Sequence, residues 1–372
     1  MEKAIEFGTT DIYFDYEDAY IQHTLLKKWD IDSLNNTTFY NKQVFDEYAK
    51  KDAAFLMLYA DDSDLMVDID ENKLASTAKM FRSSRPLYKK RQLNSEIGWC
   101  IASVATEPWA NKIFPNDDKA LEKLWDTIFK CCLVDTENPI DSWNLKLKTL
   151  EERCSILNNL KLQSLHYQNS LGTDLNIKLL KDHIWSSGLE KLQDGRDYVA
   201  NIPTEEVFTS PDKFGTNGVV YSSKPLVYNG GIIDDLKLVF KDGKVIEAVS
   251  NSNQDLLNSI ISSFPNMDYL GEVALVDYDS PISNSGLIFY ETLYDENAAC
   301  HLALGKGFPT CLLNSTDLND NEKEKLGLNN SDGHVDFMIG TNDLTITGKT
   351  IDNEEVTIFE NGNFNKRLIK TR

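Results

Sequence analysis

Apolar runs alternate with stretches of helical periodicity through the first 160 residues. The continuous apolar runs at 53–60 and 98–105 are typical of strands that are covered on both faces. Helix-forming stretches predict helices at 17–29, 44–51, 70–93, 119–131 and 139–159. A short helix at 3–7, ended by Gly8, and a strand at 11–15 are predicted before them. This alternation predicts an α/β region with a largely parallel sheet covered by helices.

Short strands separated by turn signals replace this pattern in the rest of the chain. Alternating or apolar segments predict strands at 162–168, 173–177, 218–227, 232–240, 245–249, 269–278, 335–339, 344–350 and 356–359. One helix is predicted among them, at 254–262. We therefore expect two domains, an α/β N-terminal domain at 1–170 and a β-rich α+β domain at 171–372.

The beginning of the chain resembles a fold that is already in progress. A parallel strand–helix–strand unit requires a further strand and helix ahead of the strand at 11–15. We therefore expect the N-terminal domain to lack its first strand and its first helix.

Composition and charge exclude several classes of partner. The 372 residues are 41% hydrophobic and 26% charged, which is typical of a globular protein. The formal net charge of −21 argues against nucleic acid and anionic membranes, because both attract basic surfaces. No apolar run approaches the ~18 residues of a membrane helix, and the first residues lack the apolar core of a signal peptide. Six cysteines without a Cys-x-x-Cys pair favour free thiols, so we expect a cytoplasmic protein.

Acids and histidines occur in four segments of the second half, each close to a predicted strand. Glu205 and Glu206 lie at the centre of a loop that two prolines hold in an extended course. Glu272 lies near the start of the strand at 269–278, on the same face as the small Ala274. Taken singly, a solvated acidic turn and a strand-end charge in water explain these acids as well as a functional site does.

The other two segments pair an acid with a histidine. Glu296 and His301 lie in the segment 290–305, whose neighbouring residues are mostly apolar or small. Buried carboxylates must be paired or bind a metal, and the chain must bend for these two side chains to meet, since their spacing does not suit one helix face. His334 and Asp336 are two residues apart on a predicted strand, so both point to one face. A structural histidine or a hydrogen-bonded core pair is the alternative for each pair.

Together, these segments supply a donor set of carboxylates and neutral imidazoles that divalent cations accept. One catalytic zinc typically uses three protein ligands, whereas two cations that share a bridging carboxylate would use the whole set. Such a pair activates water for hydrolysis of an amide or an ester. The candidate ligands are Glu206, Glu272, Glu296, His301, His334 and Asp336.

Four long motifs resemble those of the thermophilic-type metalloaminopeptidases, a family that includes aminopeptidases T, S and II. They read Asn-Ile-Pro-Thr-Glu-Glu-Val-Phe-Thr-Ser-Pro-Asp, Gly-Glu-Val-Ala-Leu-Val, Tyr-Glu-Thr-Leu-Tyr-Asp-Glu-Asn-Ala-Ala-Cys-His-Leu-Ala-Leu-Gly and His-Val-Asp-Phe-Met-Ile-Gly. Their order and spacing are those of the family, and the similarity extends from about residue 10 to the C-terminus.

The resemblance implies a fold, an activity and a set of roles. It implies an α/β N-terminal domain, a β-rich metal-binding domain and a homodimer. The activity is the removal of N-terminal residues from peptides with two divalent cations, Co²⁺, Zn²⁺ or Mg²⁺. The six candidate ligands match the family's metal ligands, with Glu272 as the bridging carboxylate.

Two departures from the family pattern bear on activity. Relatives begin with an additional strand and helix. Many relatives also carry a tyrosine seven residues after the ligand histidine, where this chain has Phe308, which has no hydroxyl to stabilise an oxyanion.

Glu205, next to a candidate ligand, is a candidate general base, and a supporting or solvated acid is the alternative. Two further alternatives remain for the whole chain: a two-metal hydrolase of another amide or ester, and a catalytically impaired metal-binding homologue.

Overall fold

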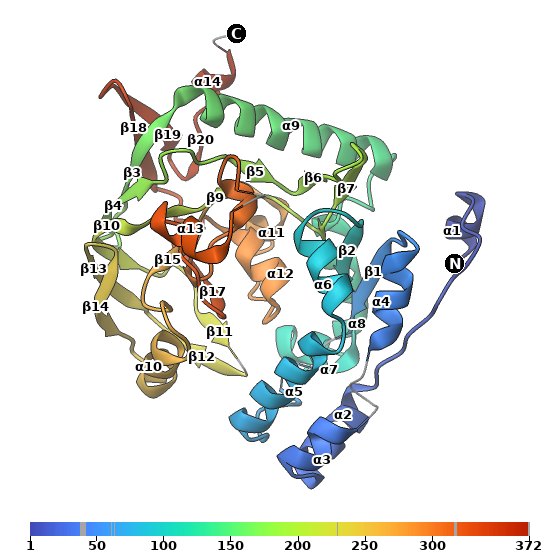
Figure 1. The fold of residues 1–372 in the computed structure, drawn as a ribbon. Coiled ribbons are helices and arrows are strands. Elements are labelled where there is room, and N and C mark those ends of the chain that lie inside the picture. Colours follow the sequence, from blue (N-terminus) through green and yellow to red (C-terminus); the bar gives the residue numbers. More distant parts are fainter. Residues whose placement is uncertain (38–41, 61, 63, 229, 316–317, 371–372) are drawn as a thin grey trace.

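The computed structural model describes residues 1–37, 42–60, 62, 64–228, 230–315 and 318–370. Figure 1 shows two regions, a helix-rich N-terminal region and a C-terminal region built mainly of strands. The chain is therefore of mixed α/β content, as the sequence predicts. The division at residue 170 stays a prediction.

The N-terminal region contains a small parallel sheet of three strands. β1 (Phe55–Tyr59) pairs in parallel with β2 (Trp99–Ser103), which pairs in parallel with β8 (Asn201–Ile202). β8 comes from beyond the predicted boundary, so the chain returns to this sheet. The helices of the region are α1 (Glu2–Glu6), α2 (Ala19–Lys28), α3 (Ile31–Asn36), α4 (Gln43–Lys50), α5 (Glu71–Ser83), α6 (Pro86–Leu93), α7 (Glu107–Ile113), α8 (Ala120–Cys131) and α9 (Pro139–Leu160).

Three predictions for this region are wrong. Residues 11–15 form no strand. The helix predicted at 70–93 is two helices, because Pro86 has no N–H to donate and begins α6 instead. β1 is not covered on both faces: Leu56 and Leu58 are 67% and 59% exposed, since β1 is the edge strand of a small sheet.

The C-terminal region is dominated by two antiparallel sheets that share one hydrophobic core. The eight-stranded sheet contains, in spatial order, β14 (Lys244–Val249), β13 (Lys237–Lys241), β10 (Pro211–Tyr221), β4 (Asp174–Leu179), β3 (Leu162–Gln168), β18 (Thr345–Thr350), β19 (Glu355–Glu360) and β20 (Asn363–Phe364). The five-stranded sheet contains β17 (His334–Met338), β16 (His301–Gly305), β15 (Leu270–Leu275), β9 (Val207–Thr209) and β5 (Ser186–Ser187).

Smaller elements complete this region. Two ribbons pair β6 with β7 and β11 with β12. Their bounds, and those of the remaining helices, are β6 (Leu189–Lys191), β7 (Asp197–Val199), β11 (Leu226–Tyr228), β12 (Gly231–Ile233), α10 (Gln254–Ser262), α11 (Pro281–Asn284), α12 (Thr292–Asp295), η2 (Glu296–Ala298), η3 (Pro309–Cys311), α13 (Asp320–Lys325) and α14 (Lys366–Lys370).

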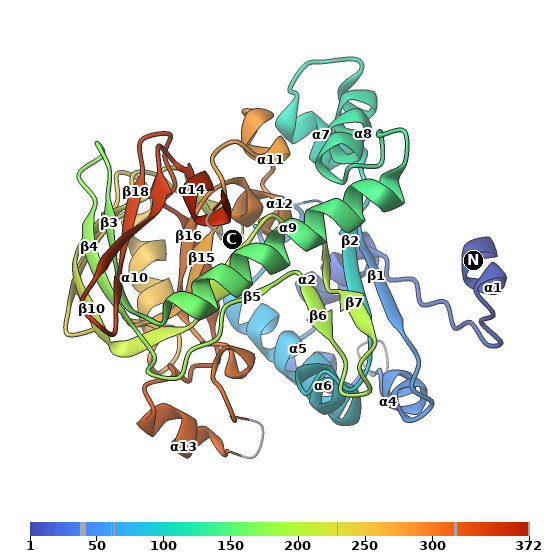
Figure 2. The ribbon, with the colours of Figure 1, turned by 90° about the horizontal axis from the view of Figure 1, so that it is seen from above.

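The long helix α9 links the two regions. It begins with Pro139 in its first turn and with the Asn138 side chain accepting a hydrogen bond from the Asp141 N–H, a typical capped start. Figure 2 shows α9 crossing the molecule, and it packs against β5, β6 and β9. The helix thus lies close to the segment that carries Glu205 and Glu206.

Candidate metal centre

The candidate ligands lie on neighbouring strands of the five-stranded sheet or directly beside them. Glu272 is on β15, His301 begins β16, His334 and Asp336 are on β17, and Glu206 immediately precedes β9. These four strands are adjacent in the order β17-β16-β15-β9. The sheet therefore brings together side chains that are far apart in the sequence.

The two faces of this sheet have opposite character. Val273, Leu302 and Phe337 point into the shared hydrophobic core. Because strand side chains alternate, Glu272, His301 and Asp336 point to the other face. Ala303 is the register partner of both Glu272 and Asp336, so only a methyl group separates these two acids on the middle strand. This small side chain leaves room for a cation between them.

The ligand atoms form two close groups that share one carboxylate. Glu206, Glu272 and His301 form the first, and Glu272, His334 and Asp336 form the second, with the ligand atoms in each group within 4.8 Å of one another. Nε2 of His301 lies 3.1 Å from Glu206 Oε2, and Nε2 of His334 lies 3.0 Å from Glu272 Oε2 and 3.2 Å from Asp336 Oδ1.

Glu296 lies beside these groups and belongs to neither. Its Oε1 accepts a hydrogen bond from Asn297 Nδ2 at 3.4 Å. Burial, followed by the charges of Asp336 and Glu206, raises the pKa of Glu296 well above its usual value. Glu296 is thus close enough to the other acids to be repelled by them.

Backbone carbonyls fix which nitrogen of each histidine faces the acids. Nδ1 of His301 donates to the carbonyl oxygen of Ala299 at 3.1 Å, and Nδ1 of His334 donates to that of Lys306 at 2.8 Å. A carbonyl oxygen can only accept, so Nδ1 carries a proton in both rings. Nε2 therefore directs a lone pair at a carboxylate oxygen unless a proton or a cation lies between them.

The electrostatics of the group favour a bound cation. Burial raises the pKa of Glu272 to about 7. Burial alone would lower the pKa of His301, but Glu206, Glu272 and Asp336 outweigh it and raise that pKa to about 10. Glu206 Oε2 and Asp336 Oδ1 are buried, and neither has a well-formed hydrogen bond within the described part of the chain. Divalent cations would satisfy these oxygens and the two Nε2 atoms together, so the donor set fits a metal site.

Comparison with known proteins agrees with this geometry. Residues 1–364 match the family described as thermophilic metalloprotease (M29). The chain belongs to the M29 family.

The similarity of this M29 chain to aminopeptidases covers almost its whole length. It is 38% identical to aminopeptidase 2 of Geobacillus stearothermophilus over 97% of this chain and 88% of that protein. It is 36% identical to aminopeptidase AmpS of Bacillus subtilis (strain 168), over 98% and 89% respectively. The structure of wild-type AmpT from Thermus thermophilus superposes with a TM-score of 0.90 at 28% identity, covering 98% of this chain and 89% of AmpT. The resemblance described from the sequence motifs is confirmed.

Glu205 has a different environment from the other acids of this M29 chain. Its buried carboxylate forms an ion pair with Nζ of Lys146 on α9, and its backbone N–H donates to Oδ1 of Asn297 at 2.7 Å. It does not join either close group. The role of Glu205 as a general base stays a prediction, and this ion pair favours a supporting role.

Phe308 lies beside the candidate ligand His334. Its ring centroid is 5.1 Å from that of His334 and 5.4 Å from that of Phe208. Its backbone N–H donates to Oγ of Ser210 at 2.8 Å. The Phe308 ring therefore packs directly against a candidate ligand.

Sequence reasoning did not find two residues that support the site, Asn297 and Lys146. Asn297 is 1% exposed, and an amide within the mostly apolar segment 290–305 is a signal that could have identified it. Lys146 gives no such signal, because it is 59 residues away from its partner Glu205.

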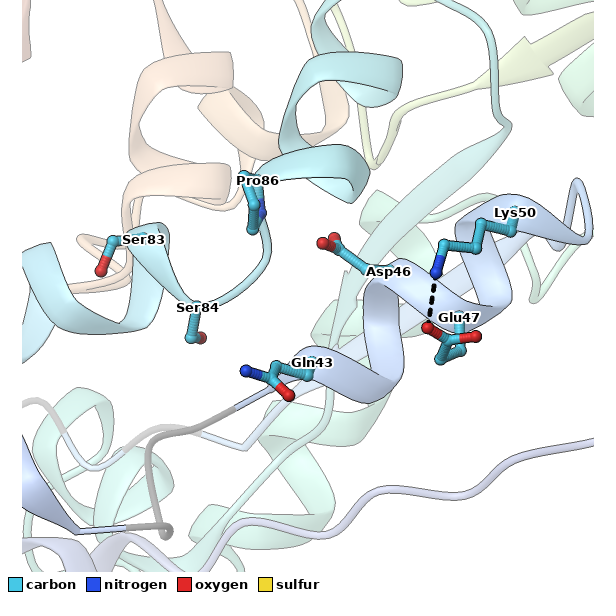
Figure 3. A pocket seen from close by; sticks show the side chains of 7 residues that line it. All are labelled: Gln43, Asp46, Glu47, Lys50, Ser83, Ser84 and Pro86. Atoms are coloured by element: carbon cyan, nitrogen blue, oxygen red, sulfur yellow. Dashed lines mark hydrogen bonds and ion pairs between the residues drawn. The ribbon is translucent and has the colours of Figure 1, made fainter.

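Two surface cavities lie apart from the candidate ligands. One, of about 260 Å³, lies between α4 and the α5–α6 corner (Figure 3) and is lined by Gln43, Asp46, Glu47, Lys50, Ser83, Ser84 and Pro86. Its acids have partners, because Lys50 contacts Glu47 at 2.6 Å and the Tyr88 N–H donates to Asp46 at 2.8 Å. The other, of about 500 Å³, is lined by Asp277, Asp279, Glu360, Asn361, Asn363, Asn365, Lys366 and Arg367. Neither contains a predicted ligand.

Proposed function

We propose that this chain removes N-terminal residues from peptides with water activated by two divalent cations. The single observation that carries the proposal is that Glu272 belongs to both close groups of ligand atoms. A carboxylate in that position can bridge two cations. One cation would be held by Glu206, Glu272 and His301 and the other by Glu272, His334 and Asp336, with Glu296 as a further ligand.

The reaction class rests on the M29 family and on the relatives. The family is one of metalloproteases, and the relatives are named aminopeptidases. The chain is accordingly a metal-dependent aminopeptidase. Hydrolysis of other amides or esters is not favoured by any of these similarities.

The protein's own residues position the chemistry. Bound divalent cations lower the pKa of water and polarise a carbonyl oxygen. The carbonyl oxygens of Ala299 and Lys306 hold the two imidazoles with Nε2 toward the acids. Glu272, 4% exposed, supplies the central carboxylate from a dry position, where electrostatic interactions are strong. Phe308 offers no hydroxyl to a developing oxyanion.

The cations, the assembly and the compartment belong to the same proposal. We expect Co²⁺, Zn²⁺ or Mg²⁺ to support activity, because carboxylate and imidazole ligands suit these ions. We expect a homodimer, as the family resemblance implies, and a cytoplasmic location, which the free cysteines favour. No helix among the described residues combines the length and apolar character needed to cross a membrane.

A substrate panel tests the proposed activity. The metal-depleted chain is supplied with Co²⁺, Zn²⁺ or Mg²⁺ and assayed with leucyl and arginyl nitroanilides, carboxylic esters and phosphoesters. We expect turnover of the aminoacyl nitroanilides only with metal. Turnover confined to esters or phosphoesters would favour a different two-metal hydrolase, and metal binding without any turnover would favour a catalytically impaired homologue.

A further inference from the structure

Two basic residues of α9 form ion pairs with acids of the C-terminal region. Lys146 pairs with Glu205, and Arg153 pairs with Asp277. The two bases are seven residues apart, or about two helical turns, so they lie on one side of α9. All four side chains are largely buried, with exposed fractions between 6% and 21%.

Glu205 is held at two points. Its carboxylate contacts Lys146, and its backbone N–H donates to Asn297 Oδ1 at 2.7 Å. The amide nitrogen of Asn297 donates to the carbonyl oxygen of Leu293 at 2.9 Å and lies 3.4 Å from Oε1 of Glu296. Asn297 therefore joins the Glu205 backbone to the segment that carries Glu296.

Fixing Glu205 constrains its neighbour Glu206. The two adjacent side chains have different partners: the Glu205 carboxylate contacts Lys146 on α9, and Glu206 Oε2 lies 3.1 Å from His301 Nε2. Because a planar peptide unit joins the two residues, holding Glu205 in place limits where the Glu206 side chain can point. Rotation of this segment would move Glu205 away from the ammonium group and Glu206 away from the candidate ligands.

We propose that Lys146 is a positioning residue that, through Glu205, directs Glu206 at a cation and so sets the affinity of one of the two cation sites. The proposal rests on the proposed pair of cations. Because Glu206 belongs to only one of the two close groups, the site of Glu206, Glu272 and His301 should depend on Lys146. The site of Glu272, His334 and Asp336 should not.

Cobalt binding tests this asymmetry without relying on catalysis. The metal-depleted full chain is titrated with Co²⁺ and followed by calorimetry and by the visible absorption of the bound ion. For Lys146→Met we expect one site to weaken by roughly 10- to 100-fold, the usual effect of losing a residue that supports a ligand, with the other site unchanged. Lys146→Arg should keep both sites, because a cation remains. Lys148→Met, which removes an exposed lysine of the same helix, is the matched control.

A double variant separates positioning from general destabilisation. Lys146→Met with Glu205→Gln removes the unpaired buried charge but still lacks the ion pair, so we expect the double variant to recover stability while the same single site stays weakened. Wild-type binding of both ions by Lys146→Met would overturn the proposal, and so would an equal loss at both sites. If Lys146→Met does not fold, Glu205→Gln disrupts the same ion pair and should weaken the same single site; unchanged or equally weakened sites in that variant would overturn the proposal.

The same titration distinguishes this inference from the proposed function. A wild-type chain that binds fewer than two Co²⁺ ions would reject the cation pair and the positioning role together. A wild-type chain that binds two ions, with a Lys146→Met variant that does the same, would reject the positioning role alone.

Discussion

The strands β1 and β15 differ in solvent exposure in the opposite sense to their hydrophobicity: the apolar β1 is largely exposed, and β15, which carries an acid, is buried. β1 reads Phe-Leu-Met-Leu-Tyr without a polar residue, yet Leu56 and Leu58 are 67% and 59% exposed. β15 contains a carboxylate, yet each of its residues is buried and Glu272 is only 4% exposed. The difference shows that the position of a strand in its sheet, and not the hydrophobicity of its residues, decides how much of the strand is exposed to solvent.

The positions of the two strands explain the contrast. β15 lies between β16 and β9 in a sheet whose one face joins the main core. β1 lies at the edge of a sheet of three strands. A buried carboxylate needs a positive partner, so the burial of Glu272 is an argument for bound cations. The exposed leucines of β1 are uncharged and need no such partner.

The largest expected effect comes from removing the buried acid. We expect Glu272→Gln to lower kcat for leucyl nitroanilide by ~10²- to 10⁴-fold, because bound cations stabilise transition-state charge by several kcal/mol. Binding of both cations should weaken, because both groups share Glu272. Steady-state kinetics and Co²⁺ titration measure the two effects. Glu247→Gln, at an exposed position of β14, is the control. Undiminished activity of Glu272→Gln would mean that its burial has another cause.

A matched pair of leucines tests the contrast in burial directly. We expect Leu275→Ala on β15 to lower the free energy of unfolding by about 2–5 kcal/mol, because a fully buried side chain leaves a cavity. Leu56→Ala on β1 should change it by less than about 0.5 kcal/mol, as exposed substitutions usually do. Urea denaturation measures both. A large loss for Leu56→Ala would show that another surface covers β1 in solution.

A substitution at Phe308 tests whether the residues around the buried carboxylate of β15 take part in catalysis. We expect Phe308→Tyr to raise kcat by up to ~10²-fold, because its hydroxyl would add one hydrogen-bond donor near His334. KM should change little, since the donor acts on charge that develops in the transition state. Nitroanilide kinetics measure both constants, with Phe208→Tyr as a variant of the neighbouring ring. An unchanged kcat would exclude an oxyanion role for this position.

The smallest expected effect is the pH dependence of the stability that a bound metal adds to the fold. The pKa of Glu272 is raised from 4.5 to about 7 and that of His301 from 6.5 to about 10, so the metal-free fold holds protons that the unfolded chain has released. Its stability should therefore fall as pH rises between about 4.5 and 10.

A bound cation replaces these protons. We therefore expect Co²⁺ to raise Tm by a few degrees more at pH 8 than at pH 6, which corresponds to about 1 kcal/mol. Scanning calorimetry with and without Co²⁺ measures the difference. A larger gain at pH 6 would contradict the assignment of these groups as ligands.

Local pattern was sufficient for many elements. The strand predicted at 162–168 and the helix predicted at 254–262 have those bounds in the structure, because alternation and helical periodicity are local properties. The shared face of His334 and Asp336 also follows from their spacing. Two of the errors occurred where a single residue or the surroundings decide, at Pro86 and at the exposed face of β1.

The sequence by itself determined which side chains could bind cations, because their types and their spacing within each motif are local. Only the tertiary structure decided that they meet, since the order β17-β16-β15-β9 comes from hydrogen bonding between strands that are distant in the chain. It also decided that Ala303 lies between Glu272 and Asp336, and that Lys146 contacts Glu205 across 59 residues. Register and helix packing depend on long-range contacts, and no local pattern contains them.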